Sequence, residues 1–428
     1  MGKYFGTDGF RGEANCNLTA DHAFKVGRFL GWYYTQLKRR SGSDGSARIV
    51  IGKDTRRSSY MFEYSLVGGL VASGADAYLL HVTTTPSVAF VVRTEGFDCG
   101  IMISASHNPY YDNGIKLINN FGEKMDESVI SLVEAYLDGN LEAFGRKWEE
   151  LPLAKRDQIG RTVDHVAGRN RYIGYLISLG MYSFKGVKVG LDCANGSSWN
   201  IAKCVFDALG AKTYVINAAP DGYNINQNAG STHIEVLQRY VVENGLDVGF
   251  AYDGDADRCL LVDETGHTID GDKVMAVCGA DLRRHGKLSG NAIVATVMSN
   301  LGLHEYCRKE GIELVCTAVG DRHVLEKMLE CGYAIGGEQS GHTIFREYAT
   351  TGDGELTALQ FLQALRRSGK RASELASCCP QYPQELINVA VSHVPGVKDA
   401  IMQDPTLRHA IAQMEQEFPE AYAEFLKV

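Results

Sequence analysis

The chain lacks the features that mark membrane, secreted and nucleic-acid-binding proteins. It has no apolar run of about 18 residues and no apolar segment near its N-terminus, so we expect neither a membrane span nor a signal peptide. Its 11 cysteines have neither the spacing of a disulfide framework nor that of a zinc site, which indicates a reduced, cytoplasmic protein. The net charge of -9 argues against nucleic acid as a partner, and an anionic ligand would need local cations.

Strand-like and helix-like segments alternate along the 428 residues, which are too many for one core. Short β-branched runs followed by segments of helical spacing occupy residues 47–106, 186–218 and 291–332. This alternation predicts an α/β protein with three similar domains, each built on a parallel or mixed sheet. We place the domains at 1–155, 156–255 and 256–368, followed by a C-terminal segment at 369–428.

Polar side chains follow three of the predicted apolar strands. The three segments read ISASHNP (103–109), YDGDADR (252–258) and GGEQSGH (336–342). Ligands of open α/β sheets bind beyond the carboxyl ends of the strands. We therefore expect one active-site cleft, assembled from these loops between the domains.

The second loop carries Asp253, Asp255 and Asp257, which share one face if the chain there is extended. Three like charges on one face need a cation, and oxygen ligands select a hard ion such as Mg²⁺ or Ca²⁺. An EF-hand is an alternative, because Glu264 falls at its twelfth position, but Arg258 stands where that loop needs glycine. A solvated acidic turn is the other alternative.

Ser106 of the first loop could complete the metal site if it were phosphorylated, since a phosphate adds negative charge and three acceptor oxygens. The alternative is a serine that caps local backbone amides. Ser104 would face the same way in a strand, so the pattern alone does not choose between the two serines. Four residues could surround such a phosphate: Arg11, His107, Lys116 and Arg258.

The third loop offers a carboxylate, a hydroxyl and an imidazole within five residues, at Glu338, Ser340 and His342. These groups suit the hydroxyls and amine of a sugar ring, and the neighbouring glycines allow a ligand to approach the backbone closely. A polar hairpin turn is the alternative.

Four motifs together identify a family. FGTDGFRG (5–12), ISASHNP, DGDADR (253–258) and GEQSGH (337–342), in this order, resemble the α-D-phosphohexomutase superfamily over nearly the whole chain. GEQSGH, where the phosphomannomutase/phosphoglucomutase branch has GEMSGH, is similar to the branch that acts on glucosamine phosphates. The resemblance implies an isomerase that interconverts glucosamine 6-phosphate and glucosamine 1-phosphate, for UDP-N-acetylglucosamine and cell-wall precursor synthesis.

The resemblance also implies roles for the residues. The serine before His-Asn-Pro, Ser106, would be the phosphoserine, and one Mg²⁺ would bind its phosphate together with Asp253, Asp255 and Asp257. Glucosamine 1,6-bisphosphate would be the intermediate. Lys116 would act as general acid/base or as a fixed charge, and Arg11, His107 and Arg258 would surround the phosphate. Glu338 and Ser340 would bind the sugar, and His342 would support the loop or bind the sugar. Relatives are often homodimers.

The domains would then be a phosphoserine domain, a metal-binding-loop domain, a sugar-binding domain and a truncated α+β remnant of a phosphate-binding domain. The last assignment reflects a departure from the family, because its Arg-Pro-Ser-Gly-Thr-Glu-Pro loop is not found here. We therefore expect weakened activity. The alternatives are a phosphomannomutase/phosphoglucomutase, a phosphatase that uses Ser106 and the metal, and an impaired sugar-phosphate-binding relative.

Overall fold

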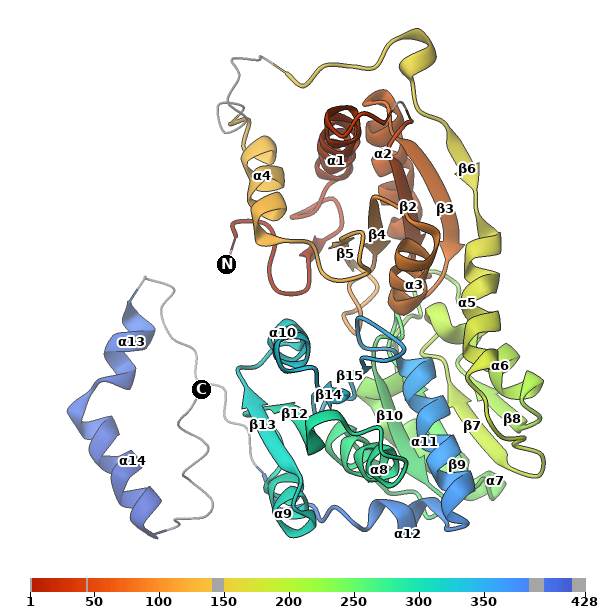
Figure 1. The fold of residues 1–428 in the computed structure, drawn as a ribbon, viewed down its shortest axis with the longest axis vertical. Coiled ribbons are helices and arrows are strands. Elements are labelled where there is room, and N and C mark those ends of the chain that lie inside the picture. The colour runs from red at the N-terminus through yellow and green to blue at the C-terminus, as the bar shows by residue number, and fades with distance from the viewer. Residues whose placement is uncertain (1, 44, 141–149, 385–395, 418–428) are drawn as a thin grey trace.

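The computed structural model describes residues 2–43, 45–140, 150–384 and 396–417. Three sheets form the body of the molecule (Figure 1), with the first sheet at the top, the second at the lower right and the third at the lower left. The prediction of three mixed-sheet α/β domains is confirmed.

The first sheet has the strand order β1-β5-β4-β2-β3-β6. Its central strands are parallel, whereas β5 pairs antiparallel with both β1 and β4. Alternate residues of β2 point to opposite faces, so Ile49 and Ile51 contact one core and Val50 the other. Helices α1, α2 and α4 cover the first face and α3 the second. The elements are β1 (Phe10–Glu13), α1 (Ala20–Arg40), β2 (Arg48–Lys53), α2 (Arg57–Ala72), β3 (Asp76–Val82), α3 (Thr85–Glu95), β4 (Cys99–Ile103), β5 (Asp112–Ile118), α4 (Glu127–Leu137), the 3₁₀ turn η2 (Arg156–Gln158) and β6 (Thr162–Asp164).

The second sheet has the order β11-β10-β9-β7-β8, in which β9 and β10 form an antiparallel hairpin. Its elements are α5 (Val166–Ser178), β7 (Lys188–Asp192), η3 (Ser197–Asn200), α6 (Ala202–Ala208), β8 (Lys212–Ile216), η4 (Gly230–His233), α7 (Ile234–Asn244), β9 (Val248–Tyr252), β10 (Cys259–Asp263) and β11 (Thr268–Ile269).

The third sheet has the order β13-β12-β14-β15 and ends in a second hairpin, β14–β15. Its elements are α8 (Gly271–Arg284), η5 (Ser289–Asn291), β12 (Ala292–Thr296), α9 (Leu301–Glu310), β13 (Glu313–Thr317), α10 (Asp321–Cys331), β14 (Ile335–Gly337), β15 (Thr343–Phe345), α11 (Gly354–Ser368) and α12 (Ala372–Ala376).

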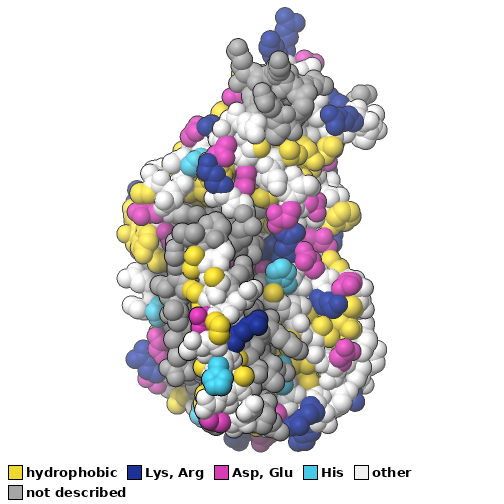
Figure 2. Space-filling view, turned by 90° about the vertical axis from the view of Figure 1, so that its left-hand side faces the viewer, with side chains coloured by type: hydrophobic (Ala, Val, Ile, Leu, Met, Phe, Trp, Pro, Cys, Tyr) yellow, Lys and Arg dark blue, Asp and Glu magenta, His cyan; other side chains and the backbone are white. Residues whose placement is uncertain are grey.

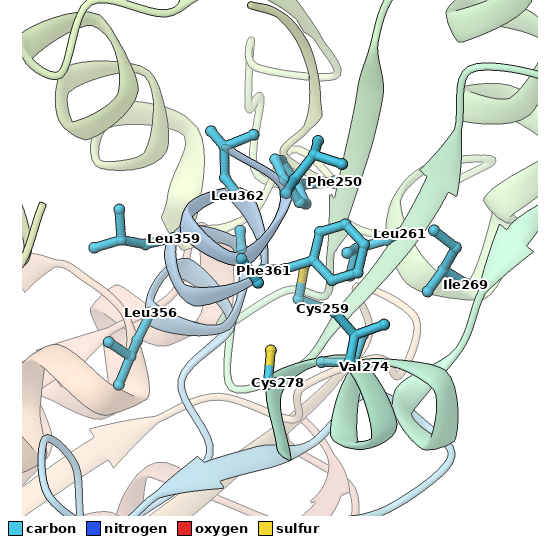
Figure 3. Close-up of a cluster of buried hydrophobic side chains, with 14 of the residues drawn as sticks. Phe250, Cys259, Leu261, Ile269, Val274, Cys278, Leu356, Leu359, Phe361 and Leu362 are labelled. Atoms are coloured by element: carbon cyan, nitrogen blue, oxygen red, sulfur yellow. The ribbon is translucent and has the colours of Figure 1, made fainter. Parts of the chain in front are cut away.

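The second and third domains share one hydrophobic core. Figure 3 shows Leu261 of β10, Val274 of α8 and Phe361 of α11 converging in it, and all three side chains are fully buried. The first domain has its own separate clusters. The second and third domains therefore form one packed unit, against which the first domain is set.

The proposed domain boundaries remain predictions. Strand β6 joins the first sheet beyond residue 155, and β10 and β11 continue the second sheet beyond residue 255. Part of the predicted C-terminal remnant, residues 385–395 and 418–428, lies outside the described residues. Between these two segments, α13 (Val397–Met402) is followed closely by α14 (Pro405–Glu417), and both stand apart from the body in Figure 1.

The surface has mixed charge on the side seen in Figure 2, where Lys and Arg are interspersed with Asp and Glu. Among the described residues, none of the helices combines the length and the apolar character that crossing a membrane requires.

Candidate active site

The three polar loops meet at a cavity of about 490 Å³ between the first domain and the other two. A neighbouring cavity of about 450 Å³ shares Asp8, Asp257 and Asp321 with it and is also lined by Lys116. Of the eleven predicted site residues, seven line the first cavity: Arg11, Ser106, Asp257, Arg258, Glu338, Ser340 and His342.

The aspartate loop joins β9 to β10, and its three side chains converge. One oxygen from each of Asp253, Asp255 and Asp257 lies within 4.8 Å of the others, and all three residues are buried. The prediction of an extended chain is wrong here, because Ala256 adopts a left-handed conformation with φ of 55° and the loop turns. The turn, and not strand alternation, brings the carboxylates together.

The carboxylate cluster fits a hard cation. Oδ1 of Asp255 and Oδ1 of Asp257 are buried and have no hydrogen-bond partner among the described residues. Burial, together with the charges of Asp257 and Asp255, raises the pKa of Asp253 to about 8. The EF-hand alternative is wrong, because β-strands flank the loop and Glu264 accepts hydrogen bonds from Ser373 instead of reaching the aspartates.

Ser106 faces the aspartates and Ser104 does not. Ser106 adopts φ of 52°, and its Oγ donates to Oδ2 of Asp253 over 2.5 Å. Ser104 Oγ instead accepts from the backbone N–H of Ser106 over 2.9 Å. The expectation that both serines face the same way therefore fails, because the strand ends at Ile103 and the chain turns.

Lys116 lies on β5 and points toward the same aspartates. Its Nζ is 2.5 Å from Oδ2 of Asp255 and 3.4 Å from Oδ2 of Asp257. Burial lowers the pKa of Lys116, but the two carboxylates more than offset this effect and hold the pKa above its ordinary value. The ammonium group therefore stays charged at neutral pH.

Of the other predicted phosphate ligands, His107 contacts Ser106, and Arg11 and Arg258 line the same cavity as Ser106. His107 Nδ1 is 3.4 Å from Ser106 Oγ, and burial, with the charges of Arg258 and Arg11, lowers the pKa of His107. These surroundings disfavour the charged form of the His107 imidazole, and its role beside the phosphate stays a prediction. Burial opposes the charge of Arg258, but Asp257 and the other nearby carboxylates raise its pKa. Arg11 on β1 pairs with Asp8 at 3.3 Å.

The third loop is the turn of the β14–β15 hairpin, so the hairpin alternative describes its backbone correctly. Oε1 of Glu338 accepts from the N–H of Gly320 over 3.1 Å, and Ser340 Oγ lies 3.4 Å from its other oxygen. His342 is buried, and its Nε2 accepts from the N–H of Gly352 over 3.0 Å. Its Nδ1 lies 3.9 Å from Asp257 and its Nε2 lies 3.5 Å from Asp321.

Comparisons with known proteins match this arrangement. Models of the α/β/α domains I, II and III of phosphoglucomutase/phosphomannomutase match residues 2–143, 170–266 and 270–382. A phosphoglucosamine mutase of Lachnospira eligens is 64% identical over 93% of this chain and 86% of its own length. One of Lachnoclostridium phytofermentans is 58% identical over 97% of this chain and 89% of its own length.

The chain belongs to the phosphoglucosamine mutases. Its identity to them favours this branch over the phosphomannomutase/phosphoglucomutase alternative. A phosphoglucomutase/phosphomannomutase family protein of Burkholderia thailandensis has the same fold, with a TM-score of 0.73 and 25% identity over 88% of this chain and 80% of its own. The N-acetylphosphoglucosamine mutase of Aspergillus fumigatus, solved with GlcNAc-6P and magnesium, shares the fold at a TM-score of 0.66 and 17% identity, over 97% of this chain and 88% of its own.

Sequence reasoning missed several residues that hold this phosphoglucosamine mutase site together. Thr85 of the first domain donates from Oγ1 to Asp255, and its N–H donates to the Asp255 carbonyl over 3.0 Å. Lys124 Nζ is 2.6 Å from Asp321 and so joins the first domain to the third. Arg56 is fully buried beneath the serine loop. Arg56 ends the polar stretch DTR directly after an apolar strand, which is the same signal that drew attention to the other loops.

Proposed function

We propose that this protein interconverts glucosamine 6-phosphate and glucosamine 1-phosphate, through a phosphoserine at Ser106 and a glucosamine 1,6-bisphosphate intermediate. The observation that carries this proposal is the position of Ser106. Its Oγ is 2.5 Å from Asp253, and it lines the same cavity as Glu338 and Ser340. The proposed nucleophile, one carboxylate of the aspartate cluster (Asp257) and the proposed sugar ligands therefore line one cavity.

We propose that Asp253, Asp255 and Asp257, with an oxygen of the Ser106 phosphate, hold one Mg²⁺. The buried, unpartnered oxygens of Asp255 and Asp257 support this assignment. When bound, the ion would act as a Lewis acid on the phosphoryl oxygens.

The proposed transfer needs positioning and charge stabilisation more than covalent help. The bond between Ser106 Oγ and phosphorus breaks as a substrate hydroxyl oxygen bonds to phosphorus. The hydroxyl proton passes to solvent, and the leaving Oγ takes up a proton from Lys116 or from solvent. We propose that Arg11 and Arg258, which line the same cavity as Ser106, stabilise charge on the transferred group. The bisphosphate then returns its other phosphate to Ser106.

Lys116 has two proposed roles. A charged ammonium group can donate a proton as general acid, or it can serve as a fixed positive charge beside the transferred group. Its contacts with Asp255 and Asp257 hold it charged in either case.

Glu338 and Ser340 are the proposed sugar ligands, because both line the cavity and Gly320 orients the Glu338 carboxylate. His342 supports the loop, because its ring accepts a hydrogen bond from the N–H of Gly352 and its Nδ1 lies 3.9 Å from Asp257. We further propose that the enzyme works in the cytoplasm, upstream of cell-wall precursor synthesis, and that it forms a homodimer.

The test is a coupled assay of glucosamine 1-phosphate formation, with and without added glucosamine 1,6-bisphosphate, combined with intact mass. The wild-type protein should form the product and carry one phosphate. Ser106→Ala should lose both, whereas the matched control Ser104→Ala should keep the phosphate. Phosphate that persists on Ser106→Ala would overturn the assignment, and stoichiometric release of inorganic phosphate would indicate a phosphatase.

A further inference from the structure

Among the described residues, Arg56 is the largest fully buried side chain, and its donors converge on one loop. Its guanidinium donates to the carbonyl of Asn108 over 2.6 Å and to that of Ser106 over 3.1 Å. Longer contacts, of 3.4 and 3.5 Å, reach Ser104 Oγ and the carbonyl of Pro109. All four acceptors belong to residues 104–109, which we call the phosphoserine loop.

The charge of Arg56 is balanced locally. Its guanidinium pairs with Asp54, which is also fully buried. Asp54 in turn accepts from Ser59 Oγ over 2.7 Å and from the N–H of Arg56 over 2.9 Å. Buried ion pairs are weak evidence for a contribution to stability, because an apolar pair of similar volume often serves equally well. The planar guanidinium of an arginine, however, holds its N–H donors in fixed directions, and it therefore fixes where each acceptor must lie.

The phosphoserine loop needs such support, because Ser106 adopts a left-handed conformation that is strained for a residue with a Cβ. A second donor, from another domain, reaches the same carbonyls. Nδ2 of Asn226, in the second domain, donates to the carbonyl of Ser106 over 2.9 Å and to that of Asn108 over 3.1 Å. With its carbonyl held by both donors, Ser106 directs its Oγ toward Asp253.

We infer that Arg56 is a positioning residue for phosphoryl transfer, holding the phosphoserine loop so that Ser106 Oγ faces the aspartate cluster. This inference rests on the proposed function, in which Ser106 carries the phosphate. Arg56 acts through the loop backbone. Its loss should therefore slow the transfer step while leaving the sugar contacts of Glu338 and Ser340 in place.

The chain offers a matched control in Arg28, a second buried arginine of the first domain. Arg28 donates to the carbonyl of Leu151 over 2.5 Å, to Ser73 Oγ over 2.6 Å and to the carbonyl of Pro152 over 3.5 Å. It therefore also supports backbone from inside the first domain, but its acceptors lie outside the cavity.

The experiment compares Arg56→Lys, the charge-balanced double variant Asp54→Asn/Arg56→Met, and the control Arg28→Met. Each full-length protein is phosphorylated and checked by mass, and kcat and KM for glucosamine 6-phosphate are measured alongside Tm. Displacing a reacting group by about 1 Å can lower the rate about 100-fold. We expect kcat to fall about 100-fold in both Arg56 variants, with KM within about threefold of the wild-type value. The kcat of Arg28→Met should stay within about threefold of the wild-type value.

Asn226→Ala serves as a second variant, because it removes the other donor to the loop and leaves the Arg56–Asp54 pair intact. It should lower kcat about tenfold at unchanged KM. The inference is overturned if the Arg56 variants keep the wild-type kcat, or if kcat falls equally in Arg28→Met. The activity of the wild-type protein is measured first. If it forms no glucosamine 1-phosphate, the proposed function itself is overturned, and the variants are not compared.

Discussion

Gly354, the first residue of α11, lies directly against the aspartate loop. Its N–H donates to the carbonyl of Ala256 over 3.0 Å. A Cβ at this position would lie 2.6 Å from the carbonyl oxygen of Arg258 and 3.0 Å from that of Ala256. Because both obstacles are backbone atoms, Gly354→Ala must displace either the helix or the loop. The helix is anchored in the shared core by Leu356 and Phe361, so we expect the loop to move (Figure 3).

The expected cost follows from overpacking, which lowers the free energy of unfolding by about 1–3 kcal/mol. The displaced carboxylates should also raise the Mg²⁺ concentration that gives half-maximal mutase activity. Urea unfolding and a Mg²⁺ titration of activity measure the two effects. The control is Gly174→Ala in α5. Apart from its own helix backbone, none of the described residues has an atom within 4 Å of the added Cβ, and alanine should stabilise the helix by up to about 1 kcal/mol. If Gly354→Ala matched the wild type in both measurements, the close contact between α11 and the loop would not position the aspartates.

Three further predictions concern the sugar loop, the contact between domains and pH. Glu338→Gln should raise KM for glucosamine 6-phosphate about 10- to 100-fold, since hydrogen bonds to a charged group contribute about 1.5–3 kcal/mol, whereas exposed Glu347→Gln should leave KM unchanged in the same assay. Lys124→Met removes the 2.6 Å contact with Asp321 and should lower the free energy of unfolding by about 1 kcal/mol, because the pair is partly exposed; a urea midpoint equal to that of the wild type would exclude this role. Burial, and to a lesser extent the charge of Asp270, raises the pKa of Asp272 to about 7. Between pH 4 and 7 the folded protein therefore binds more protons than the unfolded chain, and its free energy of unfolding should fall as the pH rises through that range. Asp272→Asn should flatten this decline in thermal unfolding curves, and an unchanged slope would contradict the assignment.

The periodic parts of the fold could be predicted from the sequence. The segment DAYLLHV is the strand β3, Asp76–Val82, because a short apolar run that follows a glycine and precedes a Thr-Pro sequence is long enough for a strand and too short for a typical helix. The positions of the three site loops followed for the same reason, since each begins where an apolar strand stops. The domain boundaries were harder to predict, because α8 and α11 of the third domain pack into a core that the second sheet also builds.

The local geometry of the site was not predictable in the same way. The aspartates converge through the left-handed conformation of Ala256, and no pattern of residue types marks an alanine for that conformation. Lys116 reaches Asp255 because β5 runs antiparallel to β4, a pairing between segments that the spacing does not reveal. The lowered pKa of His107 comes from burial and from two arginines that belong to other segments of the chain.

A single-turnover transfer experiment tests the central claim most directly. Protein carrying ³²P at Ser106 is mixed with an equimolar amount of glucosamine 6-phosphate in the presence of Mg²⁺, and the label is followed with time. Our account predicts that the label leaves Ser106, appears first in glucosamine 1,6-bisphosphate and is then divided between the sugar phosphates and the protein. Label that stays on the protein while glucosamine 1-phosphate forms, or that is released only as inorganic phosphate, would contradict it.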